Sequence, residues 1–245
     1  MSGNAIKLLM TMLMVLDHIE YFIPPWLYTV FHVATRCVAP LFAYMAVEGF
    51  VYTRQRARYV LRLSLAAVFM YAGNAILNRL LFAGTVYTVD NNIFATLAAC
   101  ILCLYCFSAI TRTRKWGINA LLCVSGGLVV LMGVFFLEWG YVLIPLALIT
   151  YYCKKKTALR NVLYFALSVA AFFLVDYKPL PSVRETLLHL SRQCQFLFIT
   201  FLPFVYLYNG KRGSASVWAK YGFYLFYPLH IWVIHVIAYI VNAAG

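Results

Sequence analysis

The chain has 245 residues, of which 64% are hydrophobic and only 11% are charged. A soluble domain has roughly 45–50% apolar and about 25% charged residues, so this composition excludes an ordinary soluble enzyme and indicates an integral membrane protein. The formal net charge of +13 is also typical of nucleic-acid-binding proteins. Here, however, the basic residues occur in short clusters between apolar runs and form no continuous basic face, so we expect no nucleic-acid partner.

The seven cysteines lie in or at the ends of apolar segments, and their odd number argues against a disulfide framework. Cys100, Cys103 and Cys106 repeat every three residues, as part of an iron–sulfur ligand run does, but no fourth cysteine follows at the spacing that such a site needs. Small residues that pack one helix against another are the better interpretation. We therefore predict no metal site.

Apolar runs long enough to cross a membrane account for most of the chain. A helix needs about 20 apolar residues to span a hydrocarbon core of roughly 30 Å, and on this basis the sequence predicts about nine transmembrane helices. Lys7 precedes the first run as in a signal peptide, but Asp17 and His18 interrupt the run and no cleavage site follows, so we expect a retained helix. The approximate limits of the nine are 6–23, 29–51, 61–83, 92–111, 116–137, 139–153, 159–175, 186–208 and 218–242.

The sequence contains no internal repeat and no separate soluble segment, so we predict one transmembrane domain over residues 1–245, an all-α polytopic membrane helix bundle. Lys and Arg are enriched in cytoplasmic loops, and most of the basic residues fall on one side of the membrane if the N-terminus is cytoplasmic. Five basic residues lie toward the outer face, where the preference of Lys and Arg for the cytoplasmic side does not explain them. They are Arg36, Arg79, Lys178, Arg184 and Arg192.

Ionisable residues inside the apolar runs are the strongest sign of function. A charge or imidazole at membrane depth costs at least a few kcal/mol unless it has a partner or faces a wet cavity. At about 1.5 Å per residue, His18 lies about 7–8 Å below the outer end of the first span, and Arg36 lies about 9 Å below the same surface in the second. A short turn makes these helices antiparallel neighbours, so we expect the two side chains to converge on one outward-opening cavity.

Further polar residues are predicted at the same outer level. Glu138 lies between the fifth and sixth spans, and Arg192 and Gln195 lie in the eighth. His230 lies near the middle of the ninth. His32, taken alone, is better interpreted as an interfacial or packing residue.

A second ionisable group falls at the inner face, where Glu48 near the end of the second span is followed by Arg54, Arg56, Arg58 and Arg62. One interpretation is topogenic charge with a Glu48–arginine ion pair. The other is an anion site, because guanidinium groups bind phosphate in bidentate fashion. The residues alone leave both open.

Several separated motifs follow one another along nearly the whole chain. The N-terminal motifs are Asp17-His18, Arg36 with Ala39-Pro40-Leu41-Phe42-Ala43, Val47-Glu48-Gly49-Phe50 with Thr53-Arg54, and Tyr59 with Arg62-Leu63. The later motifs are Asn92-Ile93-Phe94, Glu138-Trp139-Gly140-Tyr141, Leu207-Tyr208-Asn209-Gly210-Lys211-Arg212-Gly213 and Phe223-Tyr224-Leu225-Phe226-Tyr227-Pro228-Leu229-His230. With these motifs the chain resembles the TraX family of integral membrane proteins, relatives of the acyltransferase-3 superfamily. Glu138 and Glu20 depart from the family pattern, which has Asp and Gly there.

The resemblance implies transfer of an acetyl group from cytoplasmic acetyl-CoA to an acceptor outside the bacterial cytoplasmic (inner) membrane, either a pilin N-terminus or a cell-surface glycan. Acyl transfer needs a base to take a proton and a positive group to hold the oxyanion. His18 and Arg36 fit these two catalytic roles. Asp17, assigned to the same catalytic group, points about 100° away from His18 on a helix, so we expect it to pair with Arg36 or another buried cation.

The other expected site residues follow from the same resemblance. The nucleotide end of CoA is polyanionic, and the residues expected at its site are Glu48, Arg54, Arg58, Arg62, Lys211 and Arg212. The residues expected to line the substrate site or a tunnel for the pantetheine arm are Glu138, Arg192, Gln195, Tyr227 and His230. Pro228 removes one backbone hydrogen bond beside His230, which either lines this passage or acts as a second base.

Two other classes of function compete with acetyl transfer. Buried His, Arg and Glu are also found in transporters and flippases for small anionic or glycan substrates. Carriers often show two related halves, however, and this sequence shows no such symmetry. A non-catalytic assembly scaffold would leave the pairing of His18 with Arg36 unexplained.

Overall fold

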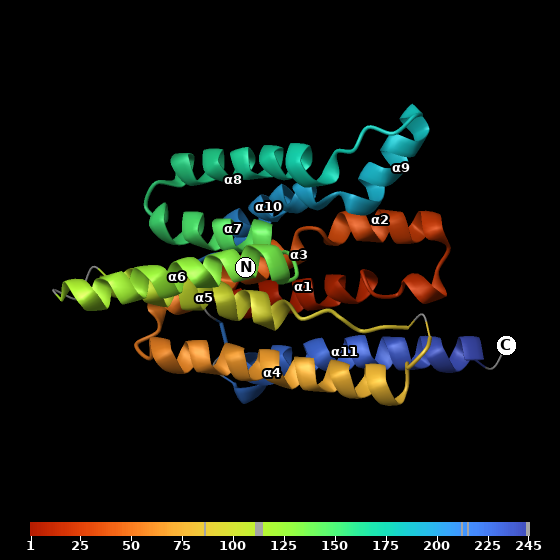
Figure 1. The fold of residues 1–245 in the computed structure, drawn as a ribbon, viewed down its shortest axis with the longest axis horizontal. Coiled ribbons are helices and arrows are strands. Elements are labelled where there is room, and N and C mark those ends of the chain that lie inside the picture. Colours follow the sequence, from red (N-terminus) through yellow and green to blue (C-terminus); the bar gives the residue numbers. More distant parts are fainter. Residues whose placement is uncertain (86, 111–114, 212, 215, 244–245) are drawn as a thin grey trace. The chain divides into compact units, whose positions relative to one another are not determined.

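The computed structural model describes residues 1–85, 87–110, 115–211, 213–214 and 216–243. Within these residues the backbone forms helices and turns and no strand, which confirms the all-α prediction. The α-helices labelled in Figure 1 are α1 (Gly3–Leu16), α2 (Pro25–Thr35), α3 (Val38–Tyr52), α4 (Arg56–Leu80), α5 (Ile93–Ile110), α6 (Trp116–Phe136), α7 (Gly140–Tyr152), α8 (Thr157–Ala171), α9 (Val183–Gln193), α10 (Leu202–Leu207) and α11 (Val217–Ala243). The other helical segments are the 3-10 helices η1 (Glu20–Phe22) and η3 (Gln195–Phe201) and the π-helix η2 (Phe172–Asp176).

Among the described residues, six helical segments are long and apolar enough to cross a membrane, which confirms a multi-pass membrane protein. They are Pro25–Tyr52, Arg56–Leu80, Ile93–Ile110, Trp116–Phe136, Thr157–Asp176 and Tyr221–Val241. A seventh span forms if Val183–Gln193 and Gln195–Leu207, which are bent by 50° at their junction, are taken together. α1 and α7 are apolar but shorter, so the predicted number of about nine is not confirmed.

The first helix ends earlier than predicted. The Ser2 hydroxyl caps its N-terminus by accepting a hydrogen bond from the Ala5 N–H at 3.3 Å, and the helix ends at Leu16. Asp17 and His18 lie in the turn that follows, so their placement inside a helix over 6–23 was wrong. Asp side chains form alternative hydrogen bonds that compete with the helix, and here the Asp17 carboxylate binds the side chain of Arg36 instead.

The described residues group into two compact units, each assembled from separate stretches of the chain. The first comprises Met1–Leu41, Ala72–Asp90 and Ser168–Gly245. Within it α1 packs against α2 and α11, and α2 packs against α9 (Figure 1). α1 buries a stripe spaced four residues apart, Ile6, Met10 and Met14, as expected of one face of a helix. This unit contains Asp17, His18 and Arg36.

The second unit comprises Phe42–Tyr71 and Asn91–Leu167, and α5 forms its core by packing against α6 and α7. Cys100, Cys103 and Cys106 are buried in α5 and are free, as the packing interpretation predicted. α6 and α7 meet closely, because a Cβ atom on Gly140 would lie 1.8 Å from the carbonyl oxygen of Gly133. Glycine is therefore required at the start of α7.

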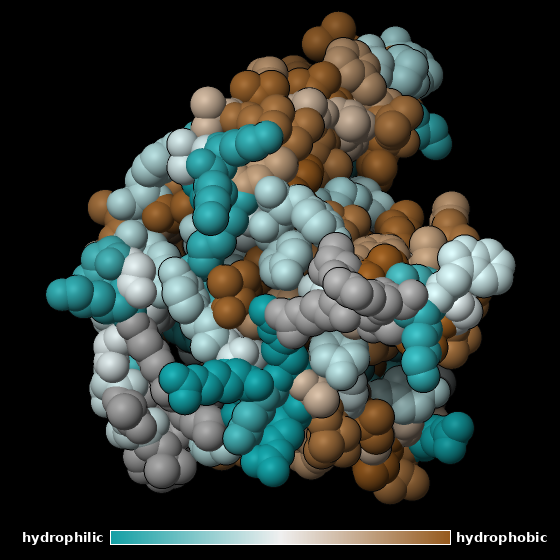
Figure 2. Space-filling model, turned by 90° about the vertical axis from the view of Figure 1, so that its left-hand side faces the viewer, coloured by the Kyte–Doolittle hydropathy of each residue, from teal (hydrophilic) through white to brown (hydrophobic). Residues whose placement is uncertain are grey.

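Large apolar side chains are exposed on several helices. On α6, the exposed fractions of Leu121, Val124 and Phe135 are 68%, 61% and 74%. Figure 2 shows hydrophobic side chains at the surface beside hydrophilic ones. Exposed apolar surface on this scale is unfavourable in water and is expected where lipid tails cover the protein.

Candidate active site

Asp17 is the centre of a polar network in the first unit. Its Oδ1 and Oδ2 atoms each accept a hydrogen bond from Arg36 Nη2 at 2.7 Å. The Thr35 hydroxyl donates to Oδ1 at 2.8 Å. Arg36 is only 5% exposed, and its Nε donates to the His32 carbonyl at 2.8 Å, which fixes the guanidinium against the last turn of α2. Asp17 is therefore paired with Arg36, the first of the two partners expected from the sequence.

His32 extends this network to a second helix. Its Nδ1 lies 3.0 Å from Asp17 Oδ1, and its Nε2 lies 2.9 Å from the carbonyl oxygen of Arg192 at the end of α9. A carbonyl oxygen can only accept, so Nε2 carries the proton and donates it. His32 thus joins α2 to α9, and it was missed as a site residue because it was interpreted as interfacial. Its spacing of four residues from Arg36, which puts both on one helix face, was the available signal.

His18 lies beside another imidazole. Its ring centroid is 5.3 Å from that of His230, and the two rings are tilted by 59°. His18 also interacts electrostatically with Asp17 and Arg36. The sequence predicted that the side chains of His18 and Arg36 converge. In the structure both residues lie near Asp17, and the His18 ring contacts the ring of His230. His230 is the residue for which the sequence left two roles open.

His230 is held in α11 with one ring nitrogen occupied. Its Nδ1 lies 3.0 Å from the carbonyl oxygen of Phe226, one turn earlier in the helix. Its Nε2 is buried and has no hydrogen-bond partner among the described residues. The ring stacks on Phe226 with centroids 5.1 Å apart at 13°, and it contacts the Tyr227 ring at 5.6 Å.

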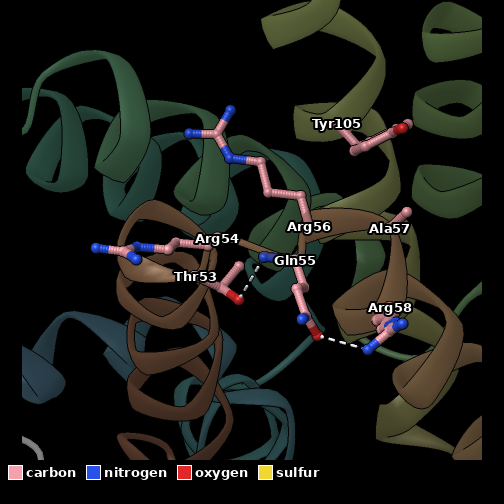
Figure 3. Close-up of a pocket in the computed structure, with 7 residues that line it drawn as sticks. All are labelled: Thr53, Arg54, Gln55, Arg56, Ala57, Arg58 and Tyr105. Carbon is pink, nitrogen blue, oxygen red and sulfur yellow. Dashed lines mark hydrogen bonds between the residues drawn. The ribbon is translucent and has the colours of Figure 1, made fainter.

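The second unit contains an open pocket of about 650 Å³ at the turn between α3 and α4. Three arginines, Arg54, Arg56 and Arg58, line it together with Thr53, Gln55, Ala57 and Tyr105. Figure 3 shows Arg54 in this turn, Arg56 and Arg58 at the start of α4, and Tyr105 on the neighbouring α5. Gln55 Oε1 accepts a hydrogen bond from Arg58 Nη1 at 3.1 Å. The size lies within the roughly 300–1,000 Å³ of ligand pockets, and the lining suits a polyanion.

Not every residue predicted for the CoA site lines this pocket. Glu48 and Arg62 do not, whereas Arg56 and Tyr105, which were outside the predicted set, do. Arg62 lies over the Tyr59 ring at 5.5 Å. Lys211 belongs to the first unit, where its carbonyl accepts a hydrogen bond from the Gly3 N–H at 2.8 Å. The prediction for Arg212 lies outside the described residues.

Glu48 is buried and pairs with a lysine. Lys154 Nζ, in the loop after α7, lies 2.9 Å from Glu48 Oε1 and 4.2 Å from the centroid of the Tyr52 ring. Partial burial would lower the pKa of Lys154, but the attraction of Glu48 outweighs this and raises the pKa above its usual value. An ion pair of Glu48 with an arginine was one of the two interpretations of the sequence, and the partner is instead Lys154, a basic residue that counted only toward the membrane orientation.

The residues predicted to line a substrate passage have different surroundings. Glu138 accepts hydrogen bonds from the Asn92 N–H at 2.7 Å and from Asn91 Nδ2 at 3.2 Å, which caps the start of α5. The Arg192 carbonyl binds His32, and Gln195 Oε1 is buried without a partner among the described residues. Tyr227, 3% exposed, lies against His230. Glu138 therefore has a structural role in the second unit.

The order and spacing of these features can be compared with known proteins. The family model described as TraX protein matches residues 2–238, nearly the whole chain. The chain belongs to the TraX family. This TraX chain is similar to a probable fimbrial assembly protein, FimC of serogroup H1 from Dichelobacter nodosus, with 25% identity over 239 residues that cover 94% of the chain and 93% of the relative. No solved structure matches the chain.

Proposed function

We propose that this TraX protein is an acetyltransferase of the bacterial cytoplasmic membrane, which moves an acetyl group from cytoplasmic acetyl-CoA to an acceptor on the extracytoplasmic side. The observation that supports it best is the ion pair of Asp17 with Arg36 directly before His18, whose imidazole interacts electrostatically with both groups. Arg36 in this pair is only 5% exposed, and a membrane protein retains a buried charge only where it is used or compensated. The three-arginine pocket supports an anionic donor.

In this proposal the residues of the first unit perform the chemistry. His18 takes the proton of the attacking amine or hydroxyl, as a neutral imidazole can. Arg36 supplies positive charge for the oxyanion that forms on the carbonyl, and Asp17 holds its guanidinium in place. His32 and Thr35 keep the Asp17 carboxylate in a single position.

The acceptor that we favour is the amino terminus of a pilin. The similar FimC protein is described as a probable fimbrial assembly protein, which fits a pilin-related role for this chain. A cell-surface glycan is the other acceptor that an extracytoplasmic site would serve.

Reconstituted protein tests the proposal directly. Proteoliposomes supplied with labelled acetyl-CoA on one side should release free CoA and label a pilin N-terminal peptide or a glycan on the other. His18→Ala should lower the rate at least 100-fold, whereas His189→Ala, a histidine outside the network, should leave it unchanged. A carrier would move substrate without releasing CoA, and a scaffold would do neither. Either result would remove the acetyltransferase proposal.

A further inference from the structure

One buried nitrogen in the first unit has no structural use. His230 is 8% exposed, and its Nε2 lies inside the protein without a hydrogen-bond partner among the described residues. Leaving a buried polar atom unpaired costs about 1–3 kcal/mol, so such atoms are rare unless they have a function or bind something. The neighbouring His18 ring shows that the atom lies at the proposed reacting centre.

The contacts of His230 determine which nitrogen carries the proton. Nδ1 faces the Phe226 carbonyl at 3.0 Å, and this oxygen can only accept, so Nδ1 is the N–H donor. In a neutral imidazole the other nitrogen then has a free lone pair. Nε2 is consequently a nucleophilic atom with nothing bound to it among the described residues.

We propose that His230 Nε2 carries the acetyl group as a covalent intermediate, an inference that rests on the proposed acetyl transfer. Acylation at Nε2 places a positive charge on the ring. The Phe226 carbonyl accepts a hydrogen bond from the charged ring, and the Phe226 ring stacks on it at 5.1 Å, so both features stabilise that charge. Burial keeps water from hydrolysing the reactive acyl-imidazole.

The two half-reactions balance in atoms and charge. In the first, the Nε2 lone pair attacks the thioester carbonyl of acetyl-CoA, the C–N bond forms, the C–S bond breaks, and the electron pair of that bond leaves on the CoA thiolate. In the second, the acceptor amine or hydroxyl attacks the acetyl carbonyl and gives its proton to His18. The C–N electron pair returns to Nε2. His18 releases its proton to solvent, from which the thiolate is protonated.

Because His230 acts in the first half-reaction and His18 only in the second, a reaction without acceptor tests the role of His230 by itself. Through a covalent intermediate, the protein should exchange labelled CoA into unlabelled acetyl-CoA with no acceptor present, because the first half-reaction is reversible. His18→Ala should keep this exchange while losing transfer to the acceptor. In His230→Gln the rate of CoA exchange should fall at least 100-fold. In His230→Ala, added free imidazole should partly restore this rate.

His235 provides a matched control on the same helix. It is 5% exposed, and its Nδ1 faces the Ile231 carbonyl at 2.9 Å, as that of His230 faces Phe226. Its ring contacts Tyr21, whereas that of His230 contacts His18. His235→Gln should therefore exchange label like the unaltered protein.

The possible results separate this inference from the proposed function. Transfer to an acceptor without any CoA exchange in the unaltered protein would overturn the covalent intermediate and leave the acetyltransferase proposal standing. Exchange by well-folded His230→Gln, or its loss in His18→Ala alone, would also overturn the role of His230. Absence of both exchange and transfer with every acceptor tested would remove the two proposals together. Because the unaltered protein decides the first case, the test does not depend on how a His230 variant folds.

Discussion

At the scale of single residues, the carboxylate of Asp17 determines the geometry of the site. It binds Arg36, Thr35 and His32, so one acidic group orders a cation, a hydroxyl and an imidazole. A buried ion pair is also a structural liability, because removing one partner leaves the other charge uncompensated. Loss of activity on changing Arg36 alone therefore has two explanations, which a paired substitution separates.

Arg36→Leu should lower the free energy of unfolding by about 1.5–3 kcal/mol, since the Asp17 carboxylate, whose side chain is 25% exposed, then lacks its charged partner. The double variant Asp17→Leu with Arg36→Leu should recover most of that stability and remain without transfer activity. Thermal denaturation and acetyl transfer, measured on the same samples, check this. Arg79→Leu, at an exposed arginine, is the control and should change neither. Recovery of activity in the double variant would show that the ion pair is only structural.

The arginine pocket gives a separate prediction. Arg54→Ala and Arg58→Ala should each raise the KM for acetyl-CoA about tenfold with little change in kcat. Each substitution removes a charge-assisted contact to a phosphate, and that contact is equally strong in the bound substrate and in the transition state. The same KM should rise with ionic strength, since both arginines are exposed. Lys115→Ala, a basic residue outside the pocket, should leave KM unchanged. A fall in kcat alone would place these arginines elsewhere in the mechanism.

The residues of the candidate site, and the pairing of Asp17 with Arg36, could be predicted from the sequence, whereas two further contacts could not. The cost of an ionisable group in a bilayer points to His18, Asp17 and Arg36 without any structure. His32 and Lys154 were missed because, by composition, one resembles an interfacial residue and the other a topogenic one. Their roles depend on contacts with Arg192 and Glu48, which lie 160 and 106 positions away in the sequence and which no local pattern predicts.

At the scale of helices, the predicted limits hold where no polar contact interrupts the run and fail where one does. The predicted run over 139–153 agrees with α7 to within one residue at each end. The predicted run over 6–23 is interrupted because Asp17 binds side chains of the next helix, and the run over 186–208 is bent by 50° between Gln193 and Gln195. Hydropathy gives the apolar stretch, but side-chain contacts set where each helix begins and ends.

The contact between α4 and α11 should depend on Gly73. A Cβ atom there would lie 2.0 Å from the Trp232 ring, and the Trp232 Nε1–H donates to Asn74 Oδ1 at 2.8 Å, so the ring has little freedom to move. Gly73→Ala should therefore destabilise the protein by about 1–3 kcal/mol through overpacking. Scanning fluorimetry of the purified protein measures the shift.

Gly222→Ala is the matched control for this substitution. A Cβ atom at Gly222 meets nothing within 4 Å, so alanine there should leave stability unchanged or raise it by up to about 1 kcal/mol through helix propensity. Equal melting temperatures for the two variants would contradict the close contact at Gly73.

At the scale of the whole molecule, the membrane topology depends on α7. Its 13 residues rise only about 20 Å, less than a hydrocarbon core of roughly 30 Å. A tight turn nevertheless joins α6 to α7, and the two helices pack together, as antiparallel neighbours do. We therefore expect residues before α6 and after α7 to lie on the same side of the membrane.

Single reporter cysteines test this arrangement. In a protein without its native cysteines, Lys115→Cys and Lys156→Cys should both react with an impermeant maleimide from the cytoplasmic side only. Lys178→Cys should react from the outside, because α8 then crosses once more. If positions 115 and 156 react from opposite sides of the membrane, α7 does not bring the chain back to the side on which α6 begins.

The bond between His32 and Arg192 has a practical consequence for handling the protein. α9 has no buried residue and begins with a capping box made by Ser182 and Glu185, so its position depends on what surrounds it. A detergent micelle that displaces α9 would withdraw the Arg192 carbonyl from His32 and loosen the imidazole that abuts Asp17. Turnover should then be lower in micelles than in lipid nanodiscs, because this one hydrogen bond is lost while every helix remains folded.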